Sequence, residues 1–595
     1  MNQSQTKICQ NCKTDFTIES EDFAFYDKIN VPPPTFCPEC RLQRRLAVLN
    51  ERILYKRKCD LCENEIFALY YPDVSFPVYC QKCWYSDNWN PMDYGKDYDF
   101  NKLFFEQYKE LMNVVPRFAF VNLNSVNCDY CAKVWNSKNC YLTIGFETED
   151  CLYGNYTRWA KNCVDYFMLV KCDSCYESIN CTSCSKVYFS QCAIECRDSY
   201  FLYDCRNCSN CFGCVNLRNK QYYIFNKPYS KEEYEKIMRD KYDLSGFENF
   251  SLAREKFNEF VNRIPRRYAA LLKTIDTTGN NIVGAKNCRN CFDSDTLNYN
   301  TENARYIFMA TGVSDSYDMS ETGEGAQLCY DSVTSFGYNI LFTVNAAGES
   351  YNVIYSDLSR PAHHIFGCIG LRNKQYCILN KQYAKEEYEE IVPKIIQHMN
   401  DAPYADKKGR IYKYGEFFPI ELSPFAYNET IANEYFPLDK KEIDNCGYRY
   451  TDIRKYKGSY DLTIRAKDIP DNIKNVKDDV LNEIIGCFNG NACKGIGVFK
   501  IIERELEFYR KNNLPLPRVC PDCRHYQRIK QRNPLKLWRR QCMCGGTQSD
   551  NRVYQNTINH NHHNDNHCSN EFETTYAPER KEIVYCEQCY QQEVV

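Results

Sequence analysis

The chain has 595 residues, room for three or more domains, with a net charge of −3 and a pI of about 6.3. This balance gives no global basic field to recruit nucleic acid, and 49 Tyr argue against disorder. The polar start MNQSQTKICQ does not resemble a signal peptide, and no apolar run of about 18 residues predicts a membrane span. We therefore expect a cytoplasmic protein with no membrane association, whose paired cysteines indicate metal or redox sites.

The first 90 residues carry four Cys-x2-Cys pairs. Two such pairs about 20 residues apart make one tetrahedral thiolate site, so residues 1–90 predict tandem zinc fingers with two ions. Iron in a rubredoxin-like site is the alternative metal. The predicted ligands are Cys9, Cys12, Cys37, Cys40, Cys59, Cys62, Cys80 and Cys83.

The second pair leads directly into RLQRRLAVLNERILYKRK, where Leu42, Leu46, Leu49 and Ile53 would share one helical face. Ligands at the first turn of a helix are typical of a treble-clef finger. A helix N-terminus and nearby Arg41 would offset the formal −2 charge of a four-thiolate zinc site. Residues 91–127 follow as a helical connector, with a helix over 104–115 that Pro116 ends.

Residues 128–228 are predicted to form a parallel β-solenoid. Fifteen of the 38 cysteines lie between Cys128 and Cys214. Seven of them follow one another mostly at steps of 11 or 12 residues, namely Cys140, Cys151, Cys163, Cys175, Cys184, Cys196 and Cys208. This step fits one strand plus one turn, and two such units would make a coil of about 22 residues.

A second solenoid copy is expected at 281–382, because residues 212–237 match 366–391 at 19 of 26 positions. In that copy Cys205, Cys208 and Cys211 become Ser359, Ala362 and Ile365, which favours a packing role for the solenoid cysteines. The alternative for the run Cys205-x2-Cys208-x2-Cys211-x2-Cys214 is an iron–sulfur cluster, although the final ferredoxin spacing is missing.

Helical connectors are predicted at 229–280, where Ser230 and Glu233 form a capping box, and at 383–484, which also holds irregular segments. The LRNKQY motif that recurs in both copies indicates how the last coil turns into a helix. Asn219 and Asn373 suit this turn, and Arg218 and Arg372 would cap it.

Residues 485–595 repeat the N-terminal zinc fingers, since 25–59 match 508–542 at fifteen of 35 positions. The predicted ligands of two further sites are Cys487, Cys493, Cys520, Cys523, Cys542, Cys544, Cys586 and Cys589. Two of these spacings depart from Cys-x2-Cys. The Asn/His-rich stretch 559–568 reads as a solvated insertion, or it supplies Cys568, His567 or His563 as a ligand.

The motifs CPECRLQRR, GCVNLRNKQYYIFNKPYSKEEY, FFPIELSPFAYNE, PRVCPDCRHYQR and YCEQCYQQEVV resemble a family of uncharacterised cysteine-rich bacterial proteins, over nearly the whole chain. In this family duplicated treble-clef or zinc-ribbon modules flank Cys/Tyr-rich repeats. The resemblance implies no activity.

Three classes of function are open. A zinc-binding scaffold with a protein partner is favoured, because solenoids expose long repetitive surfaces. Nucleic-acid binding is the alternative, since the helices after the CPxC motifs are basic. An iron–sulfur or dithiol redox protein is the third.

The sequence disfavours an enzyme. We find no phosphate loop, GxSxG or HExxH, and we interpret His363 and His364 as structural or incidental, so no catalytic residue is predicted. The candidate phosphate contacts are Arg41, Arg44, Arg45, Arg524, Arg528 and Arg532.

The sequence thus predicts a mixed multidomain fold. Two parallel β-solenoid segments with helical connectors are flanked by treble-clef or zinc-ribbon modules that bind about four zinc ions per chain.

Overall fold

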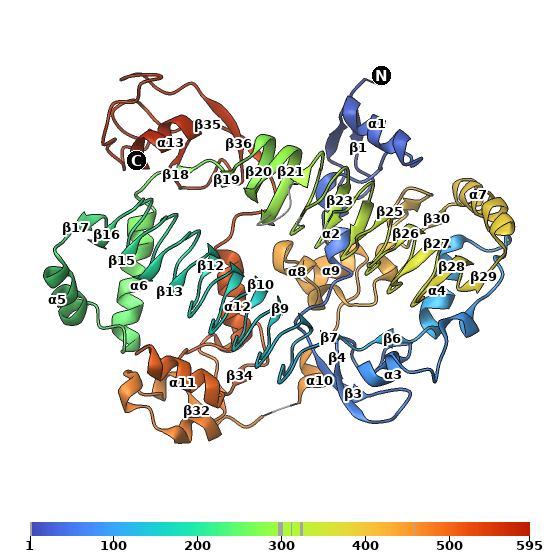
Figure 1. Cartoon of the computed structure of the whole chain (residues 1–595), viewed down its shortest axis with the longest axis horizontal. Coiled ribbons are helices and arrows are strands. Elements are labelled where there is room, and N and C mark those ends of the chain that lie inside the picture. Colours follow the sequence, from blue (N-terminus) through green and yellow to red (C-terminus); the bar gives the residue numbers. More distant parts are fainter. Residues whose placement is uncertain (1–2, 296–300, 311, 322–324, 459, 595) are drawn as a thin grey trace. The chain divides into compact units, whose positions relative to one another are not determined.

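The computed structural model describes residues 3–295, 301–310, 312–321, 325–458 and 460–594. It is a multidomain α/β structure with several parallel sheets, and the chain divides into two compact units (Figure 1). Unit 1 comprises Met1–Phe120, Ala269–Tyr456 and Leu535–Leu537, whereas unit 2 comprises Val121–Tyr268, Lys457–Pro534 and Trp538–Val595. The N-terminal cysteine pairs therefore share a unit with the second repeat segment, and the C-terminal pairs share one with the first.

The first repeat segment forms a parallel ladder in unit 2, which we call the first ladder. Its strands pair in chain order within two sheets, and Phe167 pairs with Asn155 on one side and with Ile179 on the other. The strands are β7 (Val121–Leu123), β8 (Lys133–Trp135), β9 (Ile144–Phe146), β10 (Asn155–Arg158), β11 (Phe167–Val170), β12 (Ile179–Thr182), β13 (Ser185–Tyr188), β14 (Arg197–Tyr200), β15 (Ser209–Phe212) and β16 (Gln221–Ile224).

These registers correct the expected coil length. We predicted a coil of about 22 residues made from two strand-and-turn units. In the ladder each unit pairs directly with the next, and cross-rung hydrogen bonds such as Cys175 N to Cys163 Sγ span 12 residues. Successive strands of the ladder are therefore one repeat of 12 residues apart, not two.

The backbone explains how the chain returns to pair with itself after 12 residues. Ser174, Glu177, Asn180 and Ser183 all have φ between 44° and 55°, in the left-handed region. A left-handed residue at every third position bends the chain repeatedly, and among residues other than glycine Asn and Asp tolerate this conformation best. The same period of three sets burial, because the residue two positions before each bend points inward, as Cys181 does at 0% exposure. The small inward side chains of one stretch are Cys172, Cys175, Ser178, Cys181, Cys184, Val187, Ser190, Ala193 and Cys196.

The second repeat segment forms the second ladder, in unit 1. Parts of the predicted second solenoid, at 296–300, 311 and 322–324, lie outside the described residues. Ser359, Ala362 and Ile365, which stand where the first segment has cysteines, are fully buried. This burial agrees with the packing role that we predicted for those positions. The strands are β19 (Leu271–Leu272), β20 (Ile275–Val283), β21 (Ala285–Asp295), β22 (Thr301–Glu302), β23 (Tyr317–Ser320), β24 (Tyr330–Val333), β25 (Tyr338–Leu341), β26 (Tyr351–Ile354), β27 (Ala362–Phe366) and β28 (Lys374–Ile378).

An asparagine side chain closes the last rung of each ladder. The amide of Asn226 accepts from Val215 N and donates to Val215 O, both at 2.9 Å. Asn380 makes the same pair of bonds with Ile369, at 2.8 and 2.9 Å. The side chain thus satisfies backbone groups that have no further strand to pair with. Antiparallel strands follow, β17 (Lys227–Pro228) and β29 (Lys381–Gln382), and then the helices α5 (Lys231–Lys241) and α7 (Lys385–Asp401).

The predicted helix starts are confirmed. Helix α2 (Pro38–Leu46) has Cys37 as its N-cap, and α12 (Pro521–Lys530) has Cys520. Ser230 and Glu233 form the expected capping box. The helix after Cys40 is shorter than we predicted, because α2 ends at Leu46 and leaves Leu49 and Ile53 beyond it.

Each pair of cysteine modules also contains hairpins and short helices. In unit 1 these are β1 (Gln5–Ile8), β2 (Asp15–Ile18), α1 (Ser20–Lys28), β3 (Tyr55–Lys58), β4 (Glu65–Ala68), β5 (Val78–Tyr79) and α3 (Gln81–Trp84). In unit 2 they are β32 (Ile464–Arg465), β33 (Ile485–Gly486), β34 (Val498–Phe499), α11 (Glu503–Lys511), β35 (Trp538–Gln541), β36 (Glu571–Thr574), β37 (Val584–Tyr585) and α13 (Glu587–Val594).

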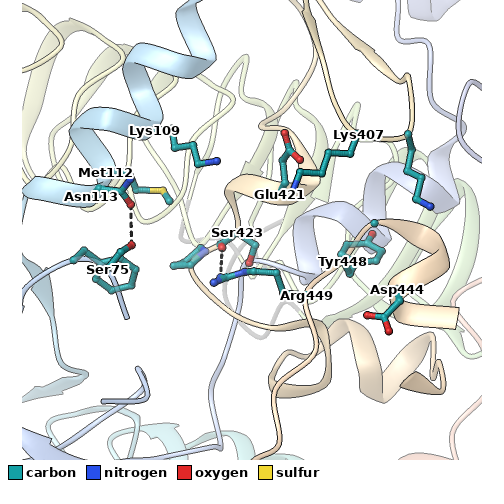
Figure 2. Close-up of a pocket in the computed structure, with 14 residues that line it drawn as sticks. Ser75, Lys109, Met112, Asn113, Lys407, Glu421, Ser423, Asp444, Tyr448 and Arg449 are labelled. Atoms are coloured by element: carbon teal, nitrogen blue, oxygen red, sulfur yellow. Dashed lines mark hydrogen bonds between the residues drawn. The ribbon is translucent and has the colours of Figure 1, made fainter. Parts of the chain in front are cut away.

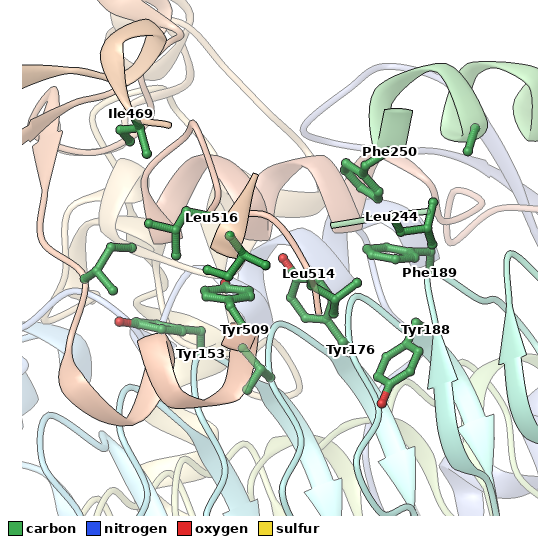
Figure 3. Close-up of a cluster of buried hydrophobic side chains, with 14 of the residues drawn as sticks. Tyr153, Tyr176, Tyr188, Phe189, Leu244, Phe250, Ile469, Tyr509, Leu514 and Leu516 are labelled. Carbon is green, nitrogen blue, oxygen red and sulfur yellow. The ribbon is translucent and has the colours of Figure 1, made fainter. Parts of the chain in front are cut away.

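An apolar cluster joins the first ladder to the helices of unit 2 (Figure 3). The Phe189 ring lies 4.6 Å from that of Phe250 on α6 (Phe247–Val261). The Tyr176 ring lies 5.6 Å from that of Tyr509 on α11. In unit 1, α4 (Phe104–Val114) packs on the second ladder, with the Phe104 ring 5.3 Å from that of Phe366. The helix predicted over 104–115 is thus present. Unit 1 further contains β6 (Arg117–Phe118), β30 (Tyr404–Ala405), β31 (Ile411–Tyr412), α8 (Ala432–Tyr435) and α9 (Lys440–Cys446), and unit 2 contains β18 (Arg266–Arg267). The short helix α10 (Arg454–Lys457) spans the boundary in sequence between the two units.

Candidate metal centres

Three of the predicted cysteine quartets come together, with all Sγ atoms of a quartet within 4.8 Å of one another. The Sγ–Sγ distance is 3.6 Å for Cys12–Cys37 and 3.9 Å for Cys62–Cys80. A tetrahedral zinc site with Zn–S bonds of about 2.3 Å has edges of about 3.8 Å, so these quartets can hold such an ion. None of the 38 cysteines forms a disulfide. The three quartets are Cys9/Cys12/Cys37/Cys40, Cys59/Cys62/Cys80/Cys83 and Cys487/Cys493/Cys520/Cys523.

Backbone amides at helix starts point at these sulfurs. Cys37 N donates to Cys9 Sγ at 3.2 Å, and Cys80 N donates to Cys59 Sγ at 3.3 Å. Burial raises the pKa of Cys59, but hydrogen bonds from the backbone amides of Cys80 and Cys62 outweigh this effect. The net result is a pKa lowered to about 7. Donors at a helix N-terminus therefore favour the thiolate form that binds metal.

The wide spacing of Cys487 and Cys493 does not prevent the third quartet from closing. A short 3-10 turn over Gly490–Ala492 bends the intervening chain back. As a result Cys493 Sγ lies 3.5 Å from Cys520 Sγ, and Cys487 Sγ lies 3.7 Å from Cys523 Sγ.

The last quartet differs from the predicted one at one position. Cys568 joins Cys542, Cys586 and Cys589, whereas Cys544 belongs to a neighbouring group with His560, His563 and Cys589. Cys542 Sγ lies 3.7 Å from Cys589 Sγ, and Cys568 Sγ lies 3.9 Å from Cys586 Sγ. The 559–568 stretch therefore brings donors to the centre.

Two histidines of this stretch have roles that the sequence left open or missed. His567, one of the ligands considered, is exposed and pairs with Asp550 at 3.0 Å instead. His560, which we did not predict, is fully buried with its Nδ1 atom 3.3 Å from Cys544 Sγ. The spacing of three residues between His560 and His563 could have indicated from the sequence that both histidines face one metal site.

In unit 1 the α2 arginines dock onto the second ladder through buried ion pairs. Arg41 contacts Asp318 at 2.8 Å, and Arg45 contacts Asp318 at 2.9 Å and Asp331 at 2.8 Å. All four side chains are at most 2% exposed. Arg44 joins them by contacting Asp331 at 2.9 Å. The first metal module is thereby fixed to two successive rungs.

In unit 2 the equivalent residues of α12 dock onto the first ladder. Arg524 and Arg528 contact Asp165 at 3.0 and 2.8 Å, and Arg524 also contacts Glu505 at 3.0 Å. The pKa of the Glu505 carboxyl is raised because the group is buried, although Arg524 opposes this shift. The Tyr153 hydroxyl donates to Glu505 at 2.8 Å.

These contacts place the residues that we considered for nucleic acid. Arg41, Arg44, Arg45, Arg524 and Arg528 are at most 2% exposed and are ion-paired, so they do not form an exposed basic surface. The sixth residue, Arg532, is half-buried with its guanidinium 4.2 Å from the Phe167 ring centre.

The LRNKQY arginines contact the second metal module of each unit. Arg372 donates to the carbonyl of Trp84, beside Cys83, and lies 4.9 Å from its ring centre. Arg218 contacts Asp204 at 3.1 Å and the hydroxyl of Tyr590, beside Cys589, at 3.3 Å. These contacts indicate that the arginines of the LRNKQY motif dock a metal module onto the ladder. This role explains why the motif recurs better than the predicted capping of a turn does.

A cavity of about 510 Å³ opens in unit 1 (Figure 2). Its wall mixes the cations Lys109, Lys407, Lys408 and Arg449 with Glu421 and Asp444. Figure 2 shows Arg449 directed to the backbone carbonyl of Ser423, at 2.6 Å. Among the described residues that line the cavity there is no His or Cys, and the arrangement suggests no particular chemistry.

No family model and no curated protein matches the chain. Among solved structures, one described as a "putative acetyltransferase" from Desulfovibrio desulfuricans G20 matches at 10% identity, covering 49% of this chain and 86% of that one, with a TM-score of 0.10. Among the described residues, no helix is long and apolar enough to cross a bilayer.

Proposed function

We propose that the chain is a zinc-binding scaffold in which treble-clef modules clamp two β-solenoids. Each ladder is one solenoid, and two thiolate modules hold each of them. The zinc ions are structural, because four-sulfur sites leave no position open for a substrate. The assembly presents a rigid surface to a protein partner.

The buried docking of α2 and α12 carries this proposal. Each helix begins at a cysteine of a quartet, and its arginines reach ladder carboxylates one and two turns later. A metal ion that fixes the first turn therefore also fixes the docking arginines. Buried guanidinium–carboxylate pairs require this positioning, because an unpaired charge inside a protein is costly.

Hydrogen exchange with and without metal tests the structural role. Removing zinc with a chelator under reducing conditions should lower amide protection in β10–β12 and β23–β24 as well as in the modules. The Cys520→Ala variant should reproduce the loss for the first ladder alone, whereas Cys446→Ala, outside these quartets, should not. Unchanged ladder protection after metal removal would contradict the proposal.

A row of exposed rings favours a protein partner. Tyr338 and Tyr351 pair in register on neighbouring rungs of the second ladder and are 53% and 38% exposed. His363 continues the row, with its ring stacked 4.2 Å from that of Tyr351. Aromatic side chains are enriched where proteins bind one another.

Quantitative affinity capture from the native cytoplasm separates the alternatives. A protein recovered with the wild type should be lost with Tyr338→Ser/Tyr351→Ser but retained with the matched control Tyr130→Ser, which alters a 41% exposed tyrosine on the first ladder. Recovery of nucleic acid whose retention falls steeply with salt would favour that alternative. Brown colour and labile sulfide in anaerobically purified protein would favour the iron–sulfur alternative.

A further inference from the structure

A second set of metal donors adjoins the Cys542 quartet in unit 2. The donor atoms of Cys544, His560, His563 and Cys589 all lie within 4.8 Å of one another. His563 Nε2 lies 3.3 Å from Cys589 Sγ and 3.2 Å from His560 Nδ1. Because Cys589 also belongs to the neighbouring quartet, its sulfur lies between the two sets.

The spacing of these atoms fits a tetrahedral ion. With Zn–S bonds of about 2.3 Å and Zn–N bonds of about 2.05 Å, tetrahedral S–N and N–N edges are about 3.6 and 3.3 Å. The distance of 3.3 Å between Cys544 Sγ and His560 Nδ1 agrees with this geometry, as do the two distances above.

The surroundings of His560 prepare its ring for a metal. Its Nε2 atom lies 2.9 Å from Glu593 Oε1, and the two side chains are 0% and 3% exposed. A proton on Nε2 that is donated to the carboxylate leaves the Nδ1 lone pair directed at the donor set. A carboxylate behind a ligating histidine is the usual support of a metal-bound imidazole.

We propose that unit 2 holds a two-metal centre with the Cys589 thiolate as a bridge. One ion is bound by Cys542, Cys568, Cys586 and Cys589, and the other by Cys544, His560, His563 and Cys589. The one-residue spacing of Cys542 and Cys544 follows, because their sulfurs serve different ions. Five thiolates and two divalent ions sum to a charge of −1, closer to neutral than a lone four-thiolate site. This centre goes beyond the scaffold function, which needs one ion here.

Metal analysis of the full chain tests the count. After a wash with a weak chelator, the wild type should retain about five zinc ions, and His560→Gln/His563→Gln should retain about four. The control His567→Gln, at an exposed histidine paired with Asp550, should match the wild type. Equal zinc content in the wild type and the double variant would overturn the second ion.

Cadmium substitution of the wild-type chain tests the bridge without any mutation. In a proton–cadmium correlation spectrum, the β-protons of Cys589 should couple to two cadmium nuclei, and the His563 ring should couple to one. Coupling of Cys589 to a single nucleus would rule out the shared thiolate. Coupling of His562 in place of His563 would overturn the ligand set, since His562 Nε2 lies 3.4 Å from the same sulfur.

Discussion

At the scale of single residues, duplicated positions reveal which side chains hold each unit together. Arg41 and Arg45 recur as Arg524 and Arg528, and all four bind ladder carboxylates. Asp22 and Glu505 also correspond. The pKa of each of these carboxyls is raised by burial, against the opposing effect of Arg305 on Asp22 and of Arg524 on Glu505.

Replacing Arg45 by Met should destabilise unit 1 strongly. Asp318 and Asp331 would remain buried with fewer partners, at a cost of about 3–5 kcal/mol in the free energy of unfolding. Urea denaturation of the metal-loaded protein measures this loss. The control Arg539→Met removes an exposed pair with Glu571 and should change stability by less than about 1 kcal/mol. Similar losses in both variants would contradict the docking role.

The sequence predicted the cysteine quartets far better than the docking contacts. Cys37 and Cys40 follow from local spacing, which a single zinc site dictates. Arg45 and Asp318 are 273 residues apart, so no local pattern connects them. The available hint was that Arg41 and Arg45 persist in the C-terminal copy. Cys568 could not be distinguished from Cys544, because both lie within reach of the other three cysteines.

At the scale of elements, a period of three residues organises the ladders. We recognised the 11- to 12-residue step from the cysteines, and the parallel registers agree with it. We missed the period of three, which the run Cys205, Cys208, Cys211, Cys214 displays directly. Each of these thiols donates to a backbone carbonyl, as Cys211 does to Ser209 at 3.4 Å. Inward packing therefore accounts for the spacing that resembled a ferredoxin motif.

Cysteines at inward ladder positions should tolerate replacement, unlike those of the quartets. Cys208→Ala copies Ala362 of the second ladder and should cost about 1 kcal/mol with no change in zinc content. Cys520→Ala should lose one ion per chain. Metal analysis and thermal unfolding of the two variants make the comparison. Loss of metal from Cys208→Ala would show that the ladder sulfurs bind an ion.

The asparagine that closes each ladder should contribute measurably to the free energy of unfolding. Asn380→Leu leaves Ile369 N and O without partners in a fully buried place, so stability should fall by about 2 kcal/mol. Hydrogen exchange should increase first in β28, at the end of the ladder. Gln382→Leu, on exposed β29, serves as the control. A uniform increase along the ladder would argue against a local cap.

At the scale of the whole molecule, the order of segments along the chain differs from their grouping in space. Unit 1 combines the N-terminal metal modules with the second ladder, and unit 2 combines the first ladder with the C-terminal metal modules. The internal repeats indicated duplication, but they could not indicate this exchange, because each module would match either ladder. Only the side chains that meet across the contact distinguish the two pairings.

This grouping predicts which fragments fold. A chain that joins 121–268 to 457–595 through a flexible linker of about 20 residues contains all main segments of unit 2, so it should unfold cooperatively and bind zinc. The contiguous half 1–268 combines modules and a ladder from different units and should not unfold cooperatively. Calorimetry of both proteins decides between the two groupings. A stable 1–268 fragment would contradict the assignment.

The long sequence separation between docking partners also determines how long the growing chain lacks them during translation. Arg45 leaves the ribosome 273 residues before Asp318, which at 5–20 residues per second is a wait of roughly 14–55 s. The delay between the synthesis of Asp165 and that of Arg528 is longer still, because the two residues are 363 positions apart. Neither half-built partner is complete during this interval. We therefore expect that early zinc binding and a chaperone would protect the incomplete chain until its docking partners have been synthesised.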